Sequence, residues 1–394
     1  MENEKKKLIG KIIVWAPVLT DHQAFTYQEL ARLSGLPIVA QVIRSEDQIR
    51  RSQGWGTTRV KSIVQTIIPK RWFIFYGFGF LWSNKRDIHI FGSAFEDWRM
   101  TVLLWFATRL GCQTYIISEP YSQKPFGYLR EQKIWIERLK CNLRPTVYRF
   151  YVFALRRGVK GVFTISNLAF NQYAAAGIPR DRLFPFGYFI PSEVLDPTAG
   201  DSPKSLDVRP LRLVFVGSLI AIKGLSILIE SVQLANTRGI NVQLDVYGPG
   251  DPNAFGFDGK LIRYLGVIPF GNTQRYLVNY DALVVPSIYD GWGVVVNEAI
   301  CAGIAVICSD QVGAKILVET FGIGLVVTIR NAETLVDKFF KLRSDPLKLD
   351  VMKARCSGAA DAIQPSRAAS YMLDVFLTAV DERHRCKSPW YPSD

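Results

Sequence analysis

Short apolar segments alternate with amphipathic segments of helical length along the whole chain. The apolar segments are rich in β-branched residues and apolar on both faces, which is typical of buried parallel strands. The first half predicts strands at 11–18, 37–43, 61–67, 87–91, 112–118 and 161–166, and helices at 22–33, 95–110 and 167–176. The second half predicts strands at 212–217, 242–248, 262–267, 282–286, 305–309 and 324–327. This alternation predicts two doubly wound, Rossmann-like α/β domains that face a cleft.

The domain boundary is predicted from a change in composition. Residues 190–205 are rich in Pro, Ser and Asp and show no periodicity, as a linker would. We therefore expect an N-terminal domain over 1–190 and a C-terminal domain over 205–364. The final segment, 365–394, is expected to begin with a helix that can cross back to the first domain.

Composition indicates a globular protein of 394 residues, 48% hydrophobic and 21% charged. No apolar run approaches the roughly 18 residues that span a bilayer, the nearest being Trp72–Trp82. The N-terminus lacks the features of a signal peptide, so we expect a cytoplasmic protein. Six cysteines without a Cys-x-x-Cys pair, together with three histidines, give no zinc spacing. We expect reduced cysteines and no metal site.

The net charge of +13 lies entirely in residues 1–200, because the basic and acidic residues of 201–394 balance. Much of the excess falls in 124–160, where Lys and Arg are interleaved with aromatic and aliphatic residues. Such a segment suits an anionic membrane surface. A solvated helix with an apolar core face is an equal alternative. No nucleic-acid-binding module accompanies the charge, so we do not expect that partner.

The segment 286–303 carries the strongest chemical signal. Asp290 follows a predicted buried strand, and Gly291 and Gly293 allow a sharp turn into a helix. Unpaired N–H groups at a helix start attract anions. Glu298 lies in this otherwise apolar helix, where a charge is costly unless it is paired or faces a cleft. An ordinary turn residue at 290 and a dipole-complementing residue at 298 are the alternatives.

Upstream, a buried strand leads into a loop with Gly217 and then into Lys223-Gly224 at the start of a helix. A lysine held there can neutralise charge that develops on a leaving diphosphate. The alternative is an exposed loop lysine. Gly248 and Gly250 end the next strand and allow close approach of the backbone to a phosphate or sugar. Residues 263–268 then place backbone polar groups where a base could lie.

Taken in order, these segments resemble the retaining GT-B glycosyltransferases of family 4 over about residues 211–330. The matching motifs are Val216-Gly217-Ser218-Leu219 with Lys223-Gly224, Tyr247-Gly248-Pro249-Gly250, Asp290-Gly-Trp292-Gly293 through Glu298-Ala299, and Ser309–Ala314. The resemblance implies that Lys223 holds the donor diphosphate, Asp290 the sugar hydroxyls and Glu298 the ribose hydroxyls. These three are the expected catalytic residues. The implied donor site is completed by Gly217, Ser218, Gly248, Gly250, Val267, Gly293 and Val294.

Two residues depart from the family pattern. The family often has arginine where Ser218 stands, and its first acid is usually glutamate, so Asp290 reaches about one methylene less far. Lys223 is then the only basic phosphate ligand that can be assigned.

The first half resembles the acceptor domain of the family more loosely, because it lacks the Gly-Gly loop after the first strand. His22 lies where that strand meets the cleft and could bond a substrate hydroxyl, or could cap or pack the helix start. Glu119, at another strand's carboxyl end, is the candidate for orienting the acceptor. A surface turn before Pro120 is its alternative.

The sequence therefore predicts sugar transfer from a nucleotide diphosphate sugar to a glycan or glycolipid acceptor, with retention. The expected setting is surface-polysaccharide synthesis, such as lipopolysaccharide or exopolysaccharide, at the inner face of a bacterial plasma membrane. No cofactor beyond the donor is expected, and Lys223 with helix N-termini would carry the diphosphate charge without metal. A nucleotide-sugar epimerase or hydrolase, or a catalytically decayed membrane-surface or polysaccharide-binding protein, are the alternatives.

Overall fold

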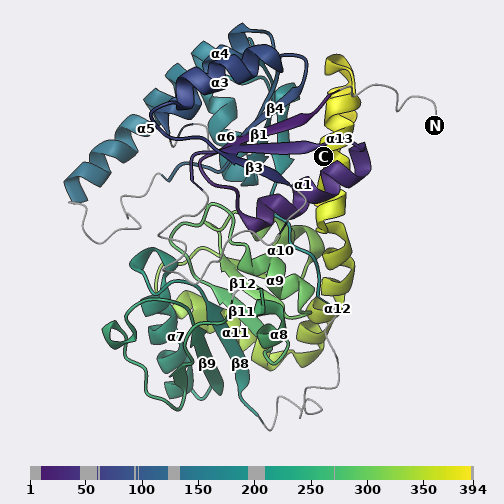
Figure 1. The fold of residues 1–394 in the computed structure, drawn as a ribbon. Helices are drawn as coiled ribbons and strands as arrows, with labels where there is room; N and C mark the ends of the chain where they lie inside the picture. The colour runs from purple at the N-terminus through teal and green to yellow at the C-terminus, as the bar shows by residue number, and fades with distance from the viewer. Residues whose placement is uncertain are drawn as a thin grey trace.

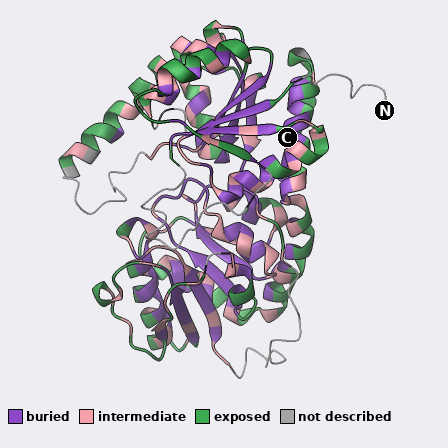
Figure 2. Ribbon diagram, in the orientation of Figure 1, coloured by how far each residue is buried: buried purple, intermediate pink, exposed green. Residues whose placement is uncertain are grey.

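The computed structural model describes residues 10–44, 60, 63–92, 95, 97–122, 134–193, 209–269 and 271–391. These residues form two α/β domains, with the N-terminal domain at the top of the view (Figure 1). Buried residues concentrate in the strands of both sheets, and exposed residues lie on the outer faces of the helices (Figure 2).

The first domain contains a seven-stranded parallel sheet in the order β3-β2-β1-β4-β5-β6-β7. Its strands are β1 Ile12–Ala16, β2 Ile38–Val42, β3 Val64–Ile67, β4 Ile88–Gly92, β5 Gln113–Ser118, β6 Val159–Ile165 and β7 Leu183–Phe186. Its helices are α1 Asp21–Ser34, α3 Phe73–Ser83, α4 Trp98–Arg109, α5 Ile134–Leu155 and α6 Ser166–Ala176, with a 3₁₀ turn at Arg180–Arg182.

The second domain contains a six-stranded parallel sheet in the order β10-β9-β8-β11-β12-β13. Its strands are β8 Leu211–Val216, β9 Val242–Tyr247, β10 Ile262–Tyr264, β11 Ala282–Val285, β12 Ala305–Ser309 and β13 Gly324–Val327. Its helices are α7 Leu225–Thr237, α8 Thr273–Leu277, α9 Val295–Cys301, α10 Lys315–Phe321, α11 Ala332–Ser344 and α12 Pro346–Ala362, with 3₁₀ turns at Ala221–Lys223 and Pro252–Ala254.

The predicted fold class is confirmed, because both halves are parallel sheets covered by helices. Every residue of β11 and β12 is buried, which explains their unbroken apolar sequences. One prediction of extent was wrong. The strand expected at 262–267 ends at Tyr264, because the chain then turns through Gly266 at φ +85°. The short edge strand β7, which includes Pro185, and the helix α3 were not predicted.

The C-terminal segment returns to the first domain along one side of the molecule (Figure 1). Helix α13, Pro365–Leu377, packs against α1, and a 3₁₀ turn follows at Val380–Arg385. Arg383 donates to the Lys160 carbonyl oxygen at 2.9 Å and to the Tyr115 hydroxyl at 2.8 Å. The predicted linker lies outside the described residues between 194 and 205, as do 124–133 of the basic segment.

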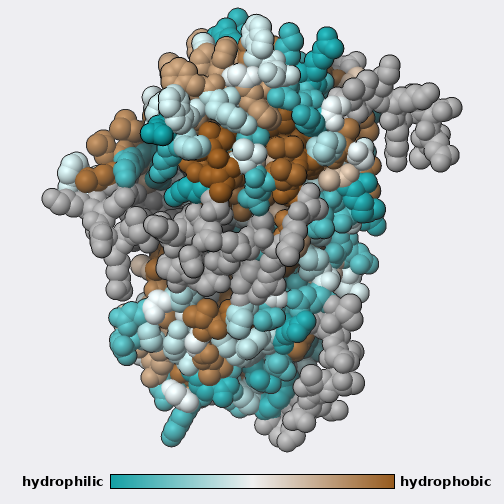
Figure 3. Space-filling model, viewed as in Figure 1, coloured by the Kyte–Doolittle hydropathy of each residue, from teal (hydrophilic) through white to brown (hydrophobic). Residues whose placement is uncertain are grey.

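Apolar surface is more extensive over the first domain than over the second in this view (Figure 3). Among the described helices, none combines the length and hydropathy needed to cross a bilayer. All six cysteines are free thiols.

Candidate active site

Lys223 and Asp290 meet at the carboxyl ends of the two central strands of the second sheet. Lys223 follows β8 and Asp290 follows β11, and the chain leaves these paired strands toward opposite edges of the sheet. Doubly wound sheets bind ligands at this kind of switch point. Lys223 Nζ donates to Asp290 Oδ2 at 2.7 Å. An ammonium has three donor hydrogens, so it can hold Asp290 and a diphosphate oxygen together.

The loop of Lys223 is clamped onto the strand end that leads to Asp290. A side chain at Gly224, which has φ +72°, would place its Cβ 2.1 Å from the Pro286 carbonyl oxygen. The Ile288 N–H donates to the Ile222 carbonyl oxygen at 2.8 Å. Glycine at 224 therefore permits the approach that brings the ammonium to the carboxylate.

The predicted donor glycines after β8 and β9 pack against each other. A Cβ at Gly248 would lie 1.8 Å from the Gly217 carbonyl oxygen, and one at Gly250 would lie 2.6 Å from Leu219 Cβ. Ser218 lies between these contacts, in the loop that Leu219 ties to the Pro249 carbonyl oxygen at 2.8 Å. The close packing of the two loops therefore requires these glycines, in addition to the approach of a ligand that their positions predict.

The loop 290–294 is fixed against residues 311–313. The Asp290 N–H donates to the Gln311 carbonyl oxygen at 3.1 Å, and the Gly313 N–H donates to the Asp290 carbonyl oxygen at 3.0 Å. Gly293 has φ +87°, and a Cβ there would lie 3.0 Å from Val312 Cγ1. Val294 follows as the N-cap of α9. These contacts position the Asp290 carboxylate for Lys223.

Glu298 is half-buried on α9, in an environment that opposes its ionisation. Burial raises its pKa to about 7, a hydrogen bond from Thr273 acts in the opposite direction, and the charge of Glu193 raises it further. The described contacts of Glu298 are thus separate from the Lys223–Asp290 pair. A carboxylate held at this energetic cost is typical of functional sites.

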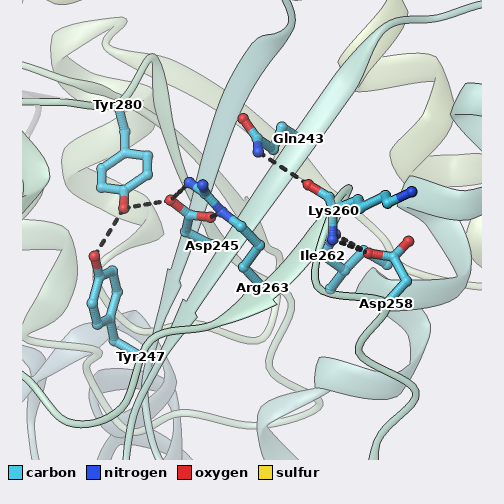
Figure 4. Close-up of polar contacts among 8 residues, drawn as sticks. All are labelled: Gln243, Asp245, Tyr247, Asp258, Lys260, Ile262, Arg263 and Tyr280. Carbon is cyan, nitrogen blue, oxygen red and sulfur yellow. Dashed lines mark hydrogen bonds and ion pairs between the residues drawn. The ribbon is translucent and has the colours of Figure 1, made fainter.

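The segment that carries Val267 is organised by an ion pair on β9 and β10. Arg263 donates twice to the buried Asp245, at 2.7 Å each, and the Tyr280 hydroxyl donates to the same carboxylate at 2.8 Å (Figure 4). Tyr247 and Tyr280 share a further hydroxyl contact of 3.0 Å. These side chains stabilise the sheet edge, and Val267 lies exposed on the loop beyond it.

Glu119 reaches this region from the first domain. A Cβ on Gly291 would lie 2.7 Å from Glu119 Oε2, so the carboxylate lies against the residue next to Asp290. Its Oε1 accepts a hydrogen bond from the Tyr188 hydroxyl. The structure therefore brings together Lys223, Asp290 and the predicted acceptor-side acid.

His22 is joined to this group through Tyr188. The two rings are 4.2 Å apart between centroids, and His22 Nε2 lies 3.1 Å from the Thr20 hydroxyl. His22 and Tyr188 also line a small pocket with Gln23 and Tyr27. His22 is buried at the start of α1, and the tyrosine that its ring contacts is the one that donates to Glu119.

Four further residues, none of them predicted as site residues, connect the domains. Trp292 Nε1 donates to Asn297 Oδ1 at 2.8 Å, and Asn297 Nδ2 donates to the Tyr188 carbonyl oxygen at 2.9 Å. The Trp292 ring lies so close to Gly187 that a Cβ there would be 2.4 Å from it. For Trp292 and Asn297 the available signal was their place inside the motif that contains Asp290 and Glu298, whereas no sequence motif marked Gly187 or Tyr188.

Comparisons with known proteins agree with this geometry. Residues 210–345 match the family model described as glycosyl transferases group 1. Over 141 residues the chain is 26% identical to an uncharacterised glycosyltransferase of Methanocaldococcus jannaschii, an alignment that covers 34% of this chain and 36% of that protein. The chain thus spans about a third of that relative.

Solved structures extend the similarity to both domains. HepE of Anabaena, in complex with UDP and glucose, superposes with a TM-score of 0.65 at 13% identity, over 93% of this chain and 99% of HepE. The chain has the GT-B glycosyltransferase fold. The GT-B fold is shared by the lipopolysaccharide outer core galactosyltransferase WaaB, with a TM-score of 0.66 at 16% identity over 93% and 99% of the two chains.

Among the described residues of this GT-B chain, no three His, Cys, Asp or Glu side chains are grouped so that they could hold a metal ion.

Proposed function

We propose that this protein is a retaining glycosyltransferase that moves a sugar from a nucleotide diphosphate sugar to a glycan or glycolipid acceptor. The observation that carries the proposal is the 2.7 Å pair of Lys223 and Asp290 at the switch point of the second sheet, with Glu119 of the first domain against Gly291. A cation can neutralise the charge that develops on a leaving diphosphate, and acids from the two domains can accept hydrogen bonds from the hydroxyls of a donor sugar and an acceptor.

Each charged side chain has a distinct role in this proposal. The Lys223 ammonium binds the diphosphate and neutralises the charge that grows on it as the glycosidic bond breaks. Asp290 accepts hydrogen bonds from the donor sugar's hydroxyls and holds the ammonium in place. Glu298, on the separate helix α9, accepts from the ribose hydroxyls, while Glu119 orients the acceptor hydroxyl.

Retention follows in the proposal from attack on the same face as the departing diphosphate. The bond from the donor carbon to the phosphate oxygen breaks while the acceptor oxygen bonds to that carbon, and the leaving phosphate takes the acceptor proton. Lys223 supplies the positive charge in this scheme, so the proposal needs no metal ion.

The comparisons support the substrate class. HepE was solved with UDP and glucose, and WaaB is a lipopolysaccharide galactosyltransferase. We extend this to the present chain as a role in bacterial surface-polysaccharide synthesis, with members of family 4 as the expected relatives.

Membrane association is the remaining part of the proposal, and α5 supports it. Arg138 and Arg149 are exposed along this helix, as are Leu139 and Leu143, and the exposed Arg156 directly follows it. Basic side chains beside apolar ones favour an anionic surface, and on this basis we propose that the protein associates with the inner face of the plasma membrane. Binding through these charges should weaken as salt is raised.

The decisive test compares Lys223→Ala with Lys260→Ala, an exposed loop lysine of the same domain. A thermal-shift screen first identifies the nucleotide sugar that stabilises the protein. Transfer is then measured with and without acceptor, and the anomeric configuration of the product is determined. We expect the Lys223 variant to lose at least about a hundredfold in kcat while staying folded, and the Lys260 variant to keep its activity.

Near-normal turnover by the Lys223 variant would refute the assignment. Donor breakdown that is unaffected by any acceptor would instead indicate a hydrolase, and an inverted product would refute the retaining mechanism.

A further inference from the structure

Helix α3 has a core face and an opposite face made of exposed aromatic side chains. Phe73, Gly77 and Leu81 are buried. Gly77 allows close packing on α4, because a Cβ there would lie 2.4 Å from Leu103 Cδ1. On the other side the exposed fractions are 76% for Phe75 and 59% for Trp82, and Trp72, Tyr76 and Phe78 are exposed with them. Five adjoining aromatic residues in water form an unusually apolar surface.

The two ends of α3 are basic. Lys70 and Arg71 precede the helix, Lys85 and Arg86 follow it, and all four are exposed. No acidic residue occurs between positions 70 and 86. The Arg71 guanidinium lies 5.6 Å from the Trp72 ring centroid, and Lys85 Nζ lies 5.7 Å from that of Trp82.

The neighbouring helix α4 continues this surface with the same pairing of tryptophan and base. Trp98 and Trp105 are exposed, with Arg99 at 6.0 Å and Arg109 at 5.4 Å from the respective ring centroids, and Arg99 also pairs with Asp97 at 2.5 Å. Phe78 of α3 and Phe106 of α4 are in edge contact at 5.1 Å. Apolar side chains are visible over these helices in the space-filling view (Figure 3).

We infer that α3 is a membrane anchor that lies in the plane of an anionic bilayer, with its aromatic face in the interfacial layer. Protein segments in the interfacial layer typically place tryptophan at the level of the headgroups and extend Lys and Arg side chains toward the lipid phosphates. With 11 residues, α3 is about 16 Å long, about half of a bilayer's hydrocarbon thickness, so it lies on the membrane and does not cross it. The absence of acidic residues from the segment favours lipid phosphates over a basic protein partner.

This inference differs from the role proposed for α5 in its physical origin. Binding through α5 charges falls as salt is raised, whereas burial of aromatic surface persists. Two weak signals together give stable yet reversible attachment.

The test uses the full chain and vesicles of phosphatidylcholine with phosphatidylglycerol. The variant Phe75→Ser/Trp82→Ser removes two exposed aromatic residues from α3. The matched control Phe340→Ser/Leu347→Ser removes two side chains of comparable exposure, 56% and 79%, from the second domain. We expect at least a tenfold loss of the partition coefficient for the α3 variant, about what loss of one buried apolar side chain produces, and less than a twofold change for the control.

A second measurement keeps the result interpretable. Brominated lipids should quench tryptophan fluorescence of the wild type, with less quenching when Trp72 is replaced by phenylalanine. Equal vesicle binding by the α3 variant and its control would overturn the inference. The inference would also be overturned if the wild type formed a dimer that binds no vesicles and the α3 substitutions converted it to a monomer, because α3 would then be a subunit contact.

The inference stands apart from the proposed enzymatic function. Transfer to a soluble acceptor should be unchanged in the α3 variant. A protein that binds vesicles through α3 but transfers no sugar would refute the proposed function alone.

Discussion

Replacing Glu298 by glutamine should make the protein more stable and weaken its binding of donor. Burial raises the pKa of Glu298 from its ordinary 4.5 to about 7. The folded protein therefore binds this proton more tightly than the unfolded chain, and ionised Glu298 lowers the free energy of unfolding as pH rises from about 4.5 to about 7. At about 1.4 kcal/mol for each pH unit, the full cost is about 3 kcal/mol.

Glutamine keeps the shape of the side chain and can accept from Thr273 without carrying charge. Because the carboxylate is only half-buried and is partly screened by water, we expect Glu298→Gln to gain about 1 to 3 kcal/mol at pH 8 and almost nothing at pH 4. If the carboxylate binds ribose hydroxyls, glutamine also loses charge-assisted hydrogen bonds, and UDP affinity should fall about tenfold or more.

Urea unfolding of both proteins at pH 4, 6 and 8 measures the first effect, and isothermal titration with UDP at pH 8 measures the second. If the free energies of unfolding of the two proteins change with pH in the same way, ionisation of Glu298 does not destabilise the fold. A stabilised variant with unchanged affinity for UDP and other nucleoside diphosphates would remove Glu298 from the donor site.

Three other substitutions test single contacts. Tyr188→Phe removes the hydrogen bond to Glu119, worth about 1.5 kcal/mol, so kcat should fall about tenfold while calorimetry finds donor affinity unchanged; a fall in donor affinity alone would contradict this role. Gly187→Ala forces a Cβ against Trp292 and should lower the free energy of unfolding in urea by about 1 to 3 kcal/mol. The control Gly358→Ala, in helix α12 with open space around it, should raise it by about 0.5 to 1 kcal/mol, and equal effects of the two substitutions would refute the clash. Arg263→Met leaves buried Asp245 without its cation and should destabilise by about 3 kcal/mol, whereas Arg238→Met, which breaks the exposed pair with Glu333, should cost less than about 1 kcal/mol. Similar melting temperatures of the two variants would show that Asp245 does not need its cation.

The second domain could be predicted closely because its strands are buried on both faces. Segments such as 282–285 and 305–309 are apolar without interruption, and the residues after them lie at one edge of the sheet by topology alone. Lys223 and Asp290 could be placed at that edge on this basis. Their direct contact depends on the fit of Gly224 to Pro286, which no local pattern encodes.

Helix α3 shows why the first domain was harder to predict. Its sequence, FIFYGFGFLWS, is apolar all round and contains two glycines, so it carries no amphipathic period. Sequence reasoning assigns such a run to the core, yet only one side of it is buried. The sequence of an apolar surface that binds a partner looks the same as that of an apolar surface that packs in the core. Only the packing in the structure distinguishes the two.

The donor motif itself combines two tasks that its sequence does not separate. Asp290 and Glu298 are the acids of the candidate site, whereas Trp292 and Asn297, between them in the chain, contact Gly187 and Tyr188 of the first domain. Tyr188 in turn holds Glu119 beside Gly291. The loop that would bind the donor sugar and the contacts that hold the two domains together are therefore parts of one short segment. A substitution at Trp292 should consequently alter domain docking and the placement of Glu119 together, although its side chain is buried and lies outside the charged group.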